Sequence, residues 1–154
     1  MASNMLPDEM KALVRRRFEA LDKGNFAILE EIFQPSDQLN VPGIPGPLSL
    51  DATKRLYQTM YAGFPDLKHN IVEQVAADDK VVTRWVASGT HSGNFMGVAP
   101  TGKRVEFTGI NIYTIEHRKF SQSQVNWDLL SLFRQIGAAN LSADLGMDAA
   151  PAAG

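Results

Sequence analysis

The chain has 154 residues, of which 44% are hydrophobic and 21% are charged, and it contains no Cys. This length and composition predict one soluble globular domain with a sizeable core. A formal net charge of -2 argues against a nucleic-acid partner. The lack of Cys excludes disulfides and thiolate chemistry, no apolar run is long enough to span a membrane, and the N-terminus lacks a secretory signal. We therefore expect a cytoplasmic protein without a membrane partner.

The N-terminal third of the chain is predicted to be mainly helical. Apolar residues recur at helical spacing over residues 7–23, which is followed by a short second helix over residues 26–33. An extended piece at 38–41 leads into a Pro/Gly-rich loop that can be neither a helix nor a central strand. A third helix follows this loop over residues 49–62, with Ser49 as a suitable cap.

The remainder of the chain changes to an alternating pattern, which is typical of strands. One long connection precedes the third of these strands, and the chain closes with a helix that ends at Gly. The predicted strands and the closing helix cover residues 67–77, 80–91, 104–116, 119–127 and 128–137.

This order of elements predicts an α+β fold, in which helices lie on one face of a curved antiparallel sheet. We assign residues 1–140 to a single domain and residues 141–154, which are small and rich in Ala, to a flexible tail.

The stretch "GVAPTGKR" at residues 97–104 has the spacing of a phosphate-binding loop. Arg104 stands where such a loop has Ser or Thr, and a strand follows where a helix is required. The sequence therefore favours a plain loop at this place.

The last strand carries a row of amides that ends in a carboxylate. Alternation places Gln122, Gln124 and Asn126 on the same face as Asp128. This row is either a solvated outer face, with Asp128 as the cap of the closing helix, or the polar wall of a cavity.

Asn111 is an amide in the middle of an apolar strand face, and Phe107 and Tyr113 share that face. A buried amide needs partners, because an unsatisfied one costs about 1–3 kcal/mol. These partners could belong to the core or to a ligand. Trp85 and His91 share a face of the strand before it, although His91 could equally lie at the edge of a loop. Apolar surroundings with a few convergent polar groups are typical of a small-molecule site.

Three stretches of the chain resemble the SnoaL-like polyketide cyclases, also called ester cyclases. They are "FPD" at 64–66, "GTHSGNFMGVAPTGK" at 89–103 and "NWDLLSLFRQIG" at 126–137. The resemblance covers about residues 10 to 137. It implies a cone-shaped α+β barrel around a deep apolar pocket, a homodimer and no cofactor.

The resemblance also implies roles for individual residues. Asp128 matches the Asp that acts as acid and base in an intramolecular aldol ring closure, and His91 matches a recurrent His. Gln122 and Gln124 replace a usual Glu and Trp, and Asn40 lies where Asp-His is common. We predict Asp128 and His91 as catalytic residues. The predicted substrate-binding residues are Asn40, Trp85, Phe107, Asn111, Tyr113, Gln122, Gln124 and Asn126.

These features predict a cofactor-free polyketide cyclase-like enzyme that acts on a hydrophobic polycyclic or ester substrate. The histidines at 69, 91 and 117 show no metal-ligand spacing, so no metal is expected. Three alternatives stay open at this point: another lyase or isomerase, an epoxide hydrolase on the same fold, or a binding protein that does not turn its ligand over.

Overall fold

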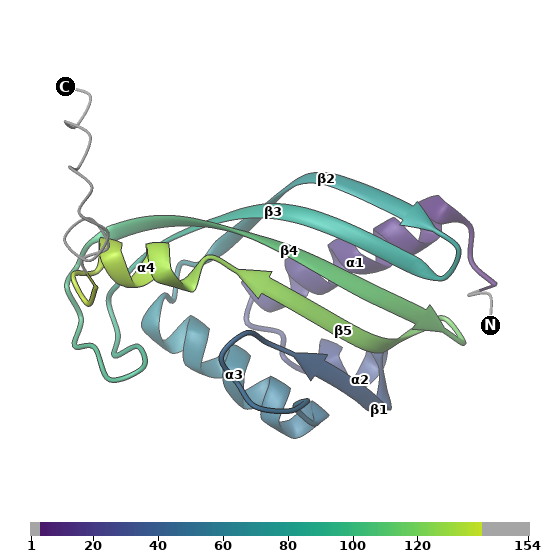
Figure 1. Ribbon diagram of the computed structural model, residues 1–154, viewed down its shortest axis with the longest axis horizontal. Coiled ribbons are helices and arrows are strands. Elements are labelled where there is room, and N and C mark those ends of the chain that lie inside the picture. Colours follow the sequence, from purple (N-terminus) through teal and green to yellow (C-terminus); the bar gives the residue numbers. More distant parts are fainter. Residues whose placement is uncertain (1–3, 140–154) are drawn as a thin grey trace.

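The computed structural model describes residues 4–139, and the tail predicted at 141–154 lies outside these residues. The α+β class predicted from the sequence is confirmed, with helices and one curved sheet (Figure 1). The first strand begins earlier than expected, directly after a shorter second helix. In chain order the elements are α1 (Pro7–Asp22), α2 (Ile28–Ile32), β1 (Phe33–Asn40), α3 (Leu50–Gly63), β2 (Lys68–Ala77), β3 (Lys80–Thr90), β4 (Arg104–Glu116), β5 (Lys119–Trp127) and α4 (Leu129–Gln135).

The five strands form one sheet in the order β1-β5-β4-β3-β2. Neighbours from β2 to β5 are antiparallel, whereas β1 runs parallel to β5, so the sheet is mixed rather than wholly antiparallel. The sheet is not closed, and β1 and β2 are its edges. Pro35 lies in the edge strand β1, which is where a residue without an amide hydrogen is tolerated.

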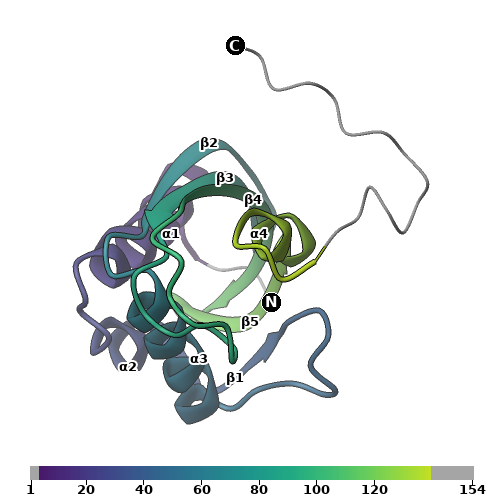
Figure 2. The ribbon, with the colours of Figure 1, turned by 90° about the vertical axis from the view of Figure 1, so that its left-hand side faces the viewer.

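The helices cover the concave side of the sheet. Seen end-on, the strands β2 to β5 curve around the side on which α1 and α3 lie, and α4 follows the end of β5 (Figure 2). The apolar stripe of α1 (Met10, Val14, Phe18 and Leu21) is buried against the core, because residues three and four apart share one helix face. None of the described helices is long and apolar enough to cross a membrane.

A bulge in β5 decides which of its side chains face inward. Phe120 pairs with Ile115 and Gln122 pairs with Thr114, so Ser121 is an extra residue in the strand. Phe120 is buried before the bulge, and Ser123 and Val125 are buried after it. The inner face of β5 beyond the bulge is therefore the face of Ser123, Val125 and Trp127.

The amides of β5 consequently lie on the outer face. Gln122, Gln124 and Asn126 are exposed, and the prediction that they line a pocket with Asn111 is wrong. Their polarity reflects contact with solvent on the convex side of the sheet, which is the ordinary position for such residues.

Asp128 is an exposed residue that caps α4. Its Oδ1 accepts a hydrogen bond from the Ser131 amide at 3.0 Å, and its own amide donates to the Thr108 carbonyl at 2.9 Å. Of the two alternatives that the sequence leaves open, the exposed helix cap is therefore the correct one, and the placement of Asp128 in the polar wall of an inner cavity is wrong. Asp128 borders a shallow hollow on the outer side of the sheet, together with Asn126 and Arg84.

The capping role of Asp128 predicts a specific pattern of stability. We expect Asp128→Ala to lower the free energy of unfolding by about 1 kcal/mol, because the orphan amides at the start of α4 lose their acceptor. Asp128→Asn, which caps about equally well, should change it by only a few tenths of a kcal/mol. Urea unfolding of both variants measures the difference. Equal losses in the two variants would contradict a capping role.

Candidate functional site

The candidate site is a narrow pocket between the inner face of the sheet and the helices α1 and α3. Apolar side chains form most of its wall, among them Leu21, Leu56, Met60 and Val125. The centres of water-sized molecules can occupy a volume of about 40 Å³ in this pocket. A polycyclic ligand would require lining side chains such as the flexible Met60 to move. The polar residues of the wall are Arg17, Tyr57, Tyr61, His69 and Asn111.

Asn111 sits on the inner face of β4 within a chain of hydrogen bonds. The Trp85 indole nitrogen donates to Asn111 Oδ1 at 3.0 Å, and Asn111 Nδ2 donates to the Tyr113 hydroxyl at 2.6 Å. The Trp85 ring crosses β4 at Gly109, where a Cβ atom would lie 2.1 Å from the ring. Trp85, Asn111 and Phe107 all line the pocket, and their predicted contact with a substrate stays a prediction.

His69 and Asp22 form a hydrogen-bonded pair at the pocket wall. His69 Nδ1 lies 2.8 Å from Asp22 Oδ1, and the His69 amide donates to Asp22 Oδ2 at 2.8 Å. The Tyr61 hydroxyl donates to the same carboxylate at 2.6 Å. The His69 ring also packs against the rings of Phe18 and Trp85, with centroids 5.0 and 4.9 Å away. The ring is therefore held in one orientation, and its Nε2 has no hydrogen-bond partner among the described residues.

The partners of Asp22 keep it ionised. Burial alone would raise the pKa of this carboxyl, but the hydrogen bonds and the charge of His69, with the Tyr61 hydroxyl, hold the pKa below its usual value. An ionised Asp22 needs a proton on His69 Nδ1 to complete their hydrogen bond. This leaves Nε2 of a neutral imidazole as the basic nitrogen.

Another carboxyl, the buried Asp37, lies on β1 outside the residues that line the pocket. Burial raises its pKa to about 6, although the Ser123 hydroxyl and the charge of Arg17 act in the opposite direction. The folded state therefore binds this proton more tightly than the unfolded chain does. Ionisation of Asp37 destabilises the fold as the pH rises from about 4 to about 6.

His91 lies outside the pocket wall and organises the loop between β3 and β4. The side chain is fully buried and stacks on Phe64 with ring centroids 5.3 Å apart. Its Nδ1 lies 3.0 Å from the Thr101 hydroxyl and accepts a hydrogen bond from the Thr101 amide at 3.3 Å. Its backbone also bonds to Gly102 and Lys103. These contacts show that His91 has a structural role in the loop. Its predicted catalytic role stays a prediction, and its position outside the pocket does not support that role.

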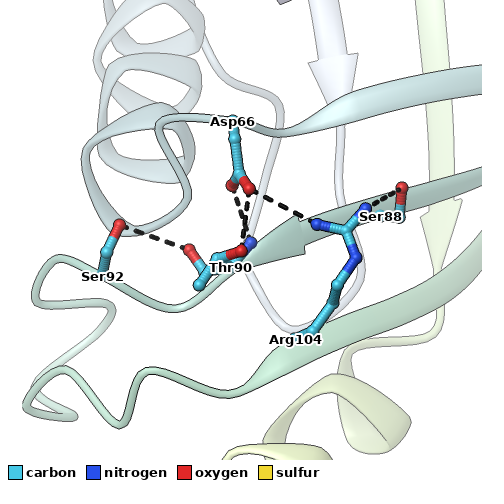
Figure 3. Close-up of polar contacts among 5 residues, drawn as sticks. All are labelled: Asp66, Ser88, Thr90, Ser92 and Arg104. Carbon is cyan, nitrogen blue, oxygen red and sulfur yellow. Dashed lines mark hydrogen bonds and ion pairs between the residues drawn. The ribbon is translucent and has the colours of Figure 1, made fainter.

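The same loop is fastened at its base by Asp66 (Figure 3). Asp66 accepts hydrogen bonds from the Thr90 amide at 2.6 Å and the Thr90 hydroxyl at 2.8 Å, and Arg104 lies 3.5 Å away. The hydrogen bond from the Thr90 backbone amide is the main reason that the pKa of Asp66 is lowered. The "FPD" and "GTH" stretches thus contact each other directly.

The other predicted site residues are not at the pocket surface. Tyr113 is fully buried behind Asn111. Asn40 is half-buried and pairs with Gln124 in the ladder between β1 and β5. Within residues 4–139, no group of three or more His, Asp or Glu side chains is placed to hold a metal ion.

Asp22 and His69 are functional candidates that the sequence alone does not predict as a pair. They are 47 positions apart and on different elements, so no local motif joins them. One signal was present. Asp22 is the last residue of α1, where the helix dipole disfavours a negative charge, and an acid at such a place needs a compensating partner.

Comparison with known proteins gives the chain relatives over most of its length. IdmH from Streptomyces antibioticus is 30% identical with a TM-score of 0.75, over 82% of this chain and 97% of its own. AclR from Streptomyces galilaeus is 23% identical with a TM-score of 0.81, over 88% and 100%. TsrD from Streptomyces laurentii is 24% identical with a TM-score of 0.78, over 88% and 100%. No curated protein sequence matches the chain significantly.

The two likenesses below 25% identity show the shared fold. The decisive finding is that the sequence profile of the SnoaL-like polyketide cyclases matches residues 12–136, which is most of the chain and includes the whole candidate site. The chain belongs to the SnoaL-like polyketide cyclase family.

Proposed function

We propose that the protein is a cofactor-free enzyme of the polyketide cyclase type, in which His69 transfers a proton to and from an apolar small molecule. The observation that carries this proposal is the Asp22–His69 pair, since it presents an oriented imidazole to an otherwise mainly apolar pocket. Histidine is the side chain best suited to proton transfer near neutral pH.

The reaction that fits this pair is an intramolecular aldol closure. His69 Nε2 takes a proton from the carbon beside a carbonyl, and the electrons of that C–H bond form an enolate. The enolate carbon attacks a second carbonyl of the same molecule, and the new alkoxide takes the proton back from Nε2. Asp22 stabilises the imidazolium between these two steps, because the carboxylate lies on the Nδ1 side.

His69 takes the place of the residues that were predicted from the sequence. Asp128 is exposed and His91 is enclosed by its loop, so neither supports proton transfer in this pocket. Epoxide hydrolysis, an alternative that the sequence leaves open, is also less well supported. No Asp or Glu is among the residues that line the pocket in the described part of the chain.

A probe for a base in an apolar site can test this proposal without the natural substrate. 5-Nitrobenzisoxazole loses its C3 proton to a base, its N–O bond breaks, and a coloured nitrophenolate forms. We expect wild-type protein to accelerate this ring opening and His69→Gln to lower the rate by roughly 10²–10⁴, the usual contribution of a positioned proton-transfer group. Asp22→Asn should also lower it, since Nδ1 loses its charged partner.

The matched control is His117→Asn, because His117 is exposed in the turn between β4 and β5 and has a positive φ that Asn tolerates. This variant should keep the wild-type rate. A His69→Gln protein that is folded and as fast as wild type would contradict the proposal, as would wild-type protein that does not accelerate the ring opening.

We also propose a homodimer that forms through the outer face of the sheet. Val75, Val82 and Ile112 lie side by side on this face, and Val75 and Ile112 are exposed. A symmetric pair would bury this apolar row, and twofold pairs are the commonest oligomers.

Light scattering tests the dimer through the molar mass in solution. We expect twice the chain mass of 16.9 kDa for the wild type and the monomer mass for Val75→Lys, because the added charge would be buried in the interface. Leu6→Lys, at an exposed site beside α1, should not change the mass. A wild-type mass of 16.9 kDa at high concentration would refute the dimer.

A further inference from the structure

Arg17 of α1 is a buried cation without an anionic partner. Arg17 is only 2% exposed, and a guanidinium stays protonated in proteins. One of its terminal nitrogens donates to the Tyr57 hydroxyl, whereas its Nε is buried with no hydrogen-bond partner. No carboxylate oxygen of the described residues lies within 4.0 Å of the group. Buried charges are usually paired, so this arrangement is incomplete.

The surroundings of Arg17 stabilise its charge only in part. The guanidinium carbon lies 4.6, 4.9 and 5.3 Å from the ring centroids of Phe18, Tyr57 and Tyr113. Cation–π contacts of this kind fix the plane of the group but do not occupy its N–H donors. The buried carboxyl of Asp37 influences Arg17 only from a distance, and its own hydrogen bond comes from Ser123.

The pocket that Arg17 lines is short of hydrogen-bond acceptors. Trp127 lines the same pocket, and its indole nitrogen is a second buried donor with no partner. The ionisable side chains of the wall include Arg17 and His69 but no Asp or Glu from the described residues. The residues that line the pocket thus include one permanent cation and two N–H groups without a hydrogen-bond partner.

We propose that the natural ligand carries a carboxylate, that Arg17 is its counter-ion, and that the Trp127 indole donates a hydrogen bond to the ligand. This inference rests on the proposed function only in that the pocket binds the substrate. It narrows the substrate class to an apolar acid, as opposed to a neutral ester or alcohol. A guanidinium suits this task, since its fork of donors matches the two oxygens of a carboxylate.

Binding of small aromatic probes tests the inference without turnover. Benzoate, benzyl alcohol and methyl benzoate share one ring and differ in the group that Arg17 would meet. The chain has two Trp residues, so proton–nitrogen correlation spectra contain two indole signals, which Trp127→Phe assigns. We expect benzoate to bind at least about 10-fold more tightly than either neutral probe, as a hydrogen bond to a charged group should provide. The Trp127 indole signal should move more than that of Trp85, whose N–H is already bonded to Asn111.

Two neighbouring arginines provide a matched pair of variants. Arg17→Met should weaken benzoate binding roughly 10- to 100-fold and leave benzyl alcohol unaffected, whereas Arg16→Met should change neither. Arg16 is exposed and paired with Glu31, so it controls for the loss of charge on α1. Met fills much of the volume of Arg, and apolar replacement of a buried charge is often tolerated.

Several results would overturn the inference. The first is wild-type protein that binds benzyl alcohol or methyl benzoate as tightly as benzoate. This result overturns the inference even if Arg17→Met fails to fold, because it needs no variant. Equal benzoate affinities for Arg17→Met and Arg16→Met would do so as well. Wild-type protein that prefers benzoate but lacks a His69-dependent reaction would support this inference and contradict the proposed function. A His69-dependent reaction without a preference for benzoate would contradict this inference alone.

Discussion

The structure depends on one constraint: a polar group enclosed by the curved sheet must find a partner or lose about 1–3 kcal/mol. Asn111 meets this requirement through Trp85 and Tyr113, and Asp22 meets it through His69 and Tyr61. These contacts join α1, α3 and three strands around the pocket. Five buried polar atoms of the described residues fail to meet it, and two of these, Arg17 Nε and the Trp127 indole nitrogen, belong to residues that line that pocket. Unsatisfied donors there indicate where a ligand belongs.

The stretches that resemble the family stabilise the scaffold around the pocket. Asp66 of "FPD" binds Thr90 of "GTH", and His91 binds Thr101 of "PTG". Gly93 allows the loop to approach the end of α3, since a Cβ atom there would lie 2.0 Å from the Ala62 carbonyl oxygen. These contacts hold the connection from β3 to β4 against α3. The stretches therefore stabilise the fold, whereas the residues to which we assign the proposed chemistry, Asp22 and His69, lie elsewhere.

The sequence alone predicts much of the fold and part of the site. Periodicity locates α1, α3 and the strands from β2 to β5, and alternation correctly groups Phe107, Asn111 and Tyr113 on the inner face of β4. In β5 the same alternation defines two faces but does not say which is inside. The prediction that the polar face lines the pocket is therefore wrong. The bulge at Ser121 also exchanges the inner and outer positions along β5, and no pattern of residues in the sequence indicates it. The pairing of Asp22 with His69 depends on tertiary packing between α1 and β2, which local patterns do not encode.

The most direct test of the central claim is the position of the proton on the neutral His69 ring. Long-range proton–nitrogen NMR spectra distinguish the two ring nitrogens, and His69→Gln assigns the signals. We predict a proton on Nδ1, because this nitrogen donates to the ionised Asp22, and an unprotonated Nε2 that is available as a base. In Asp22→Asn this preference should weaken. A neutral His69 with its proton on Nε2 in the wild-type protein would contradict the claim, because the pocket would then contain no base.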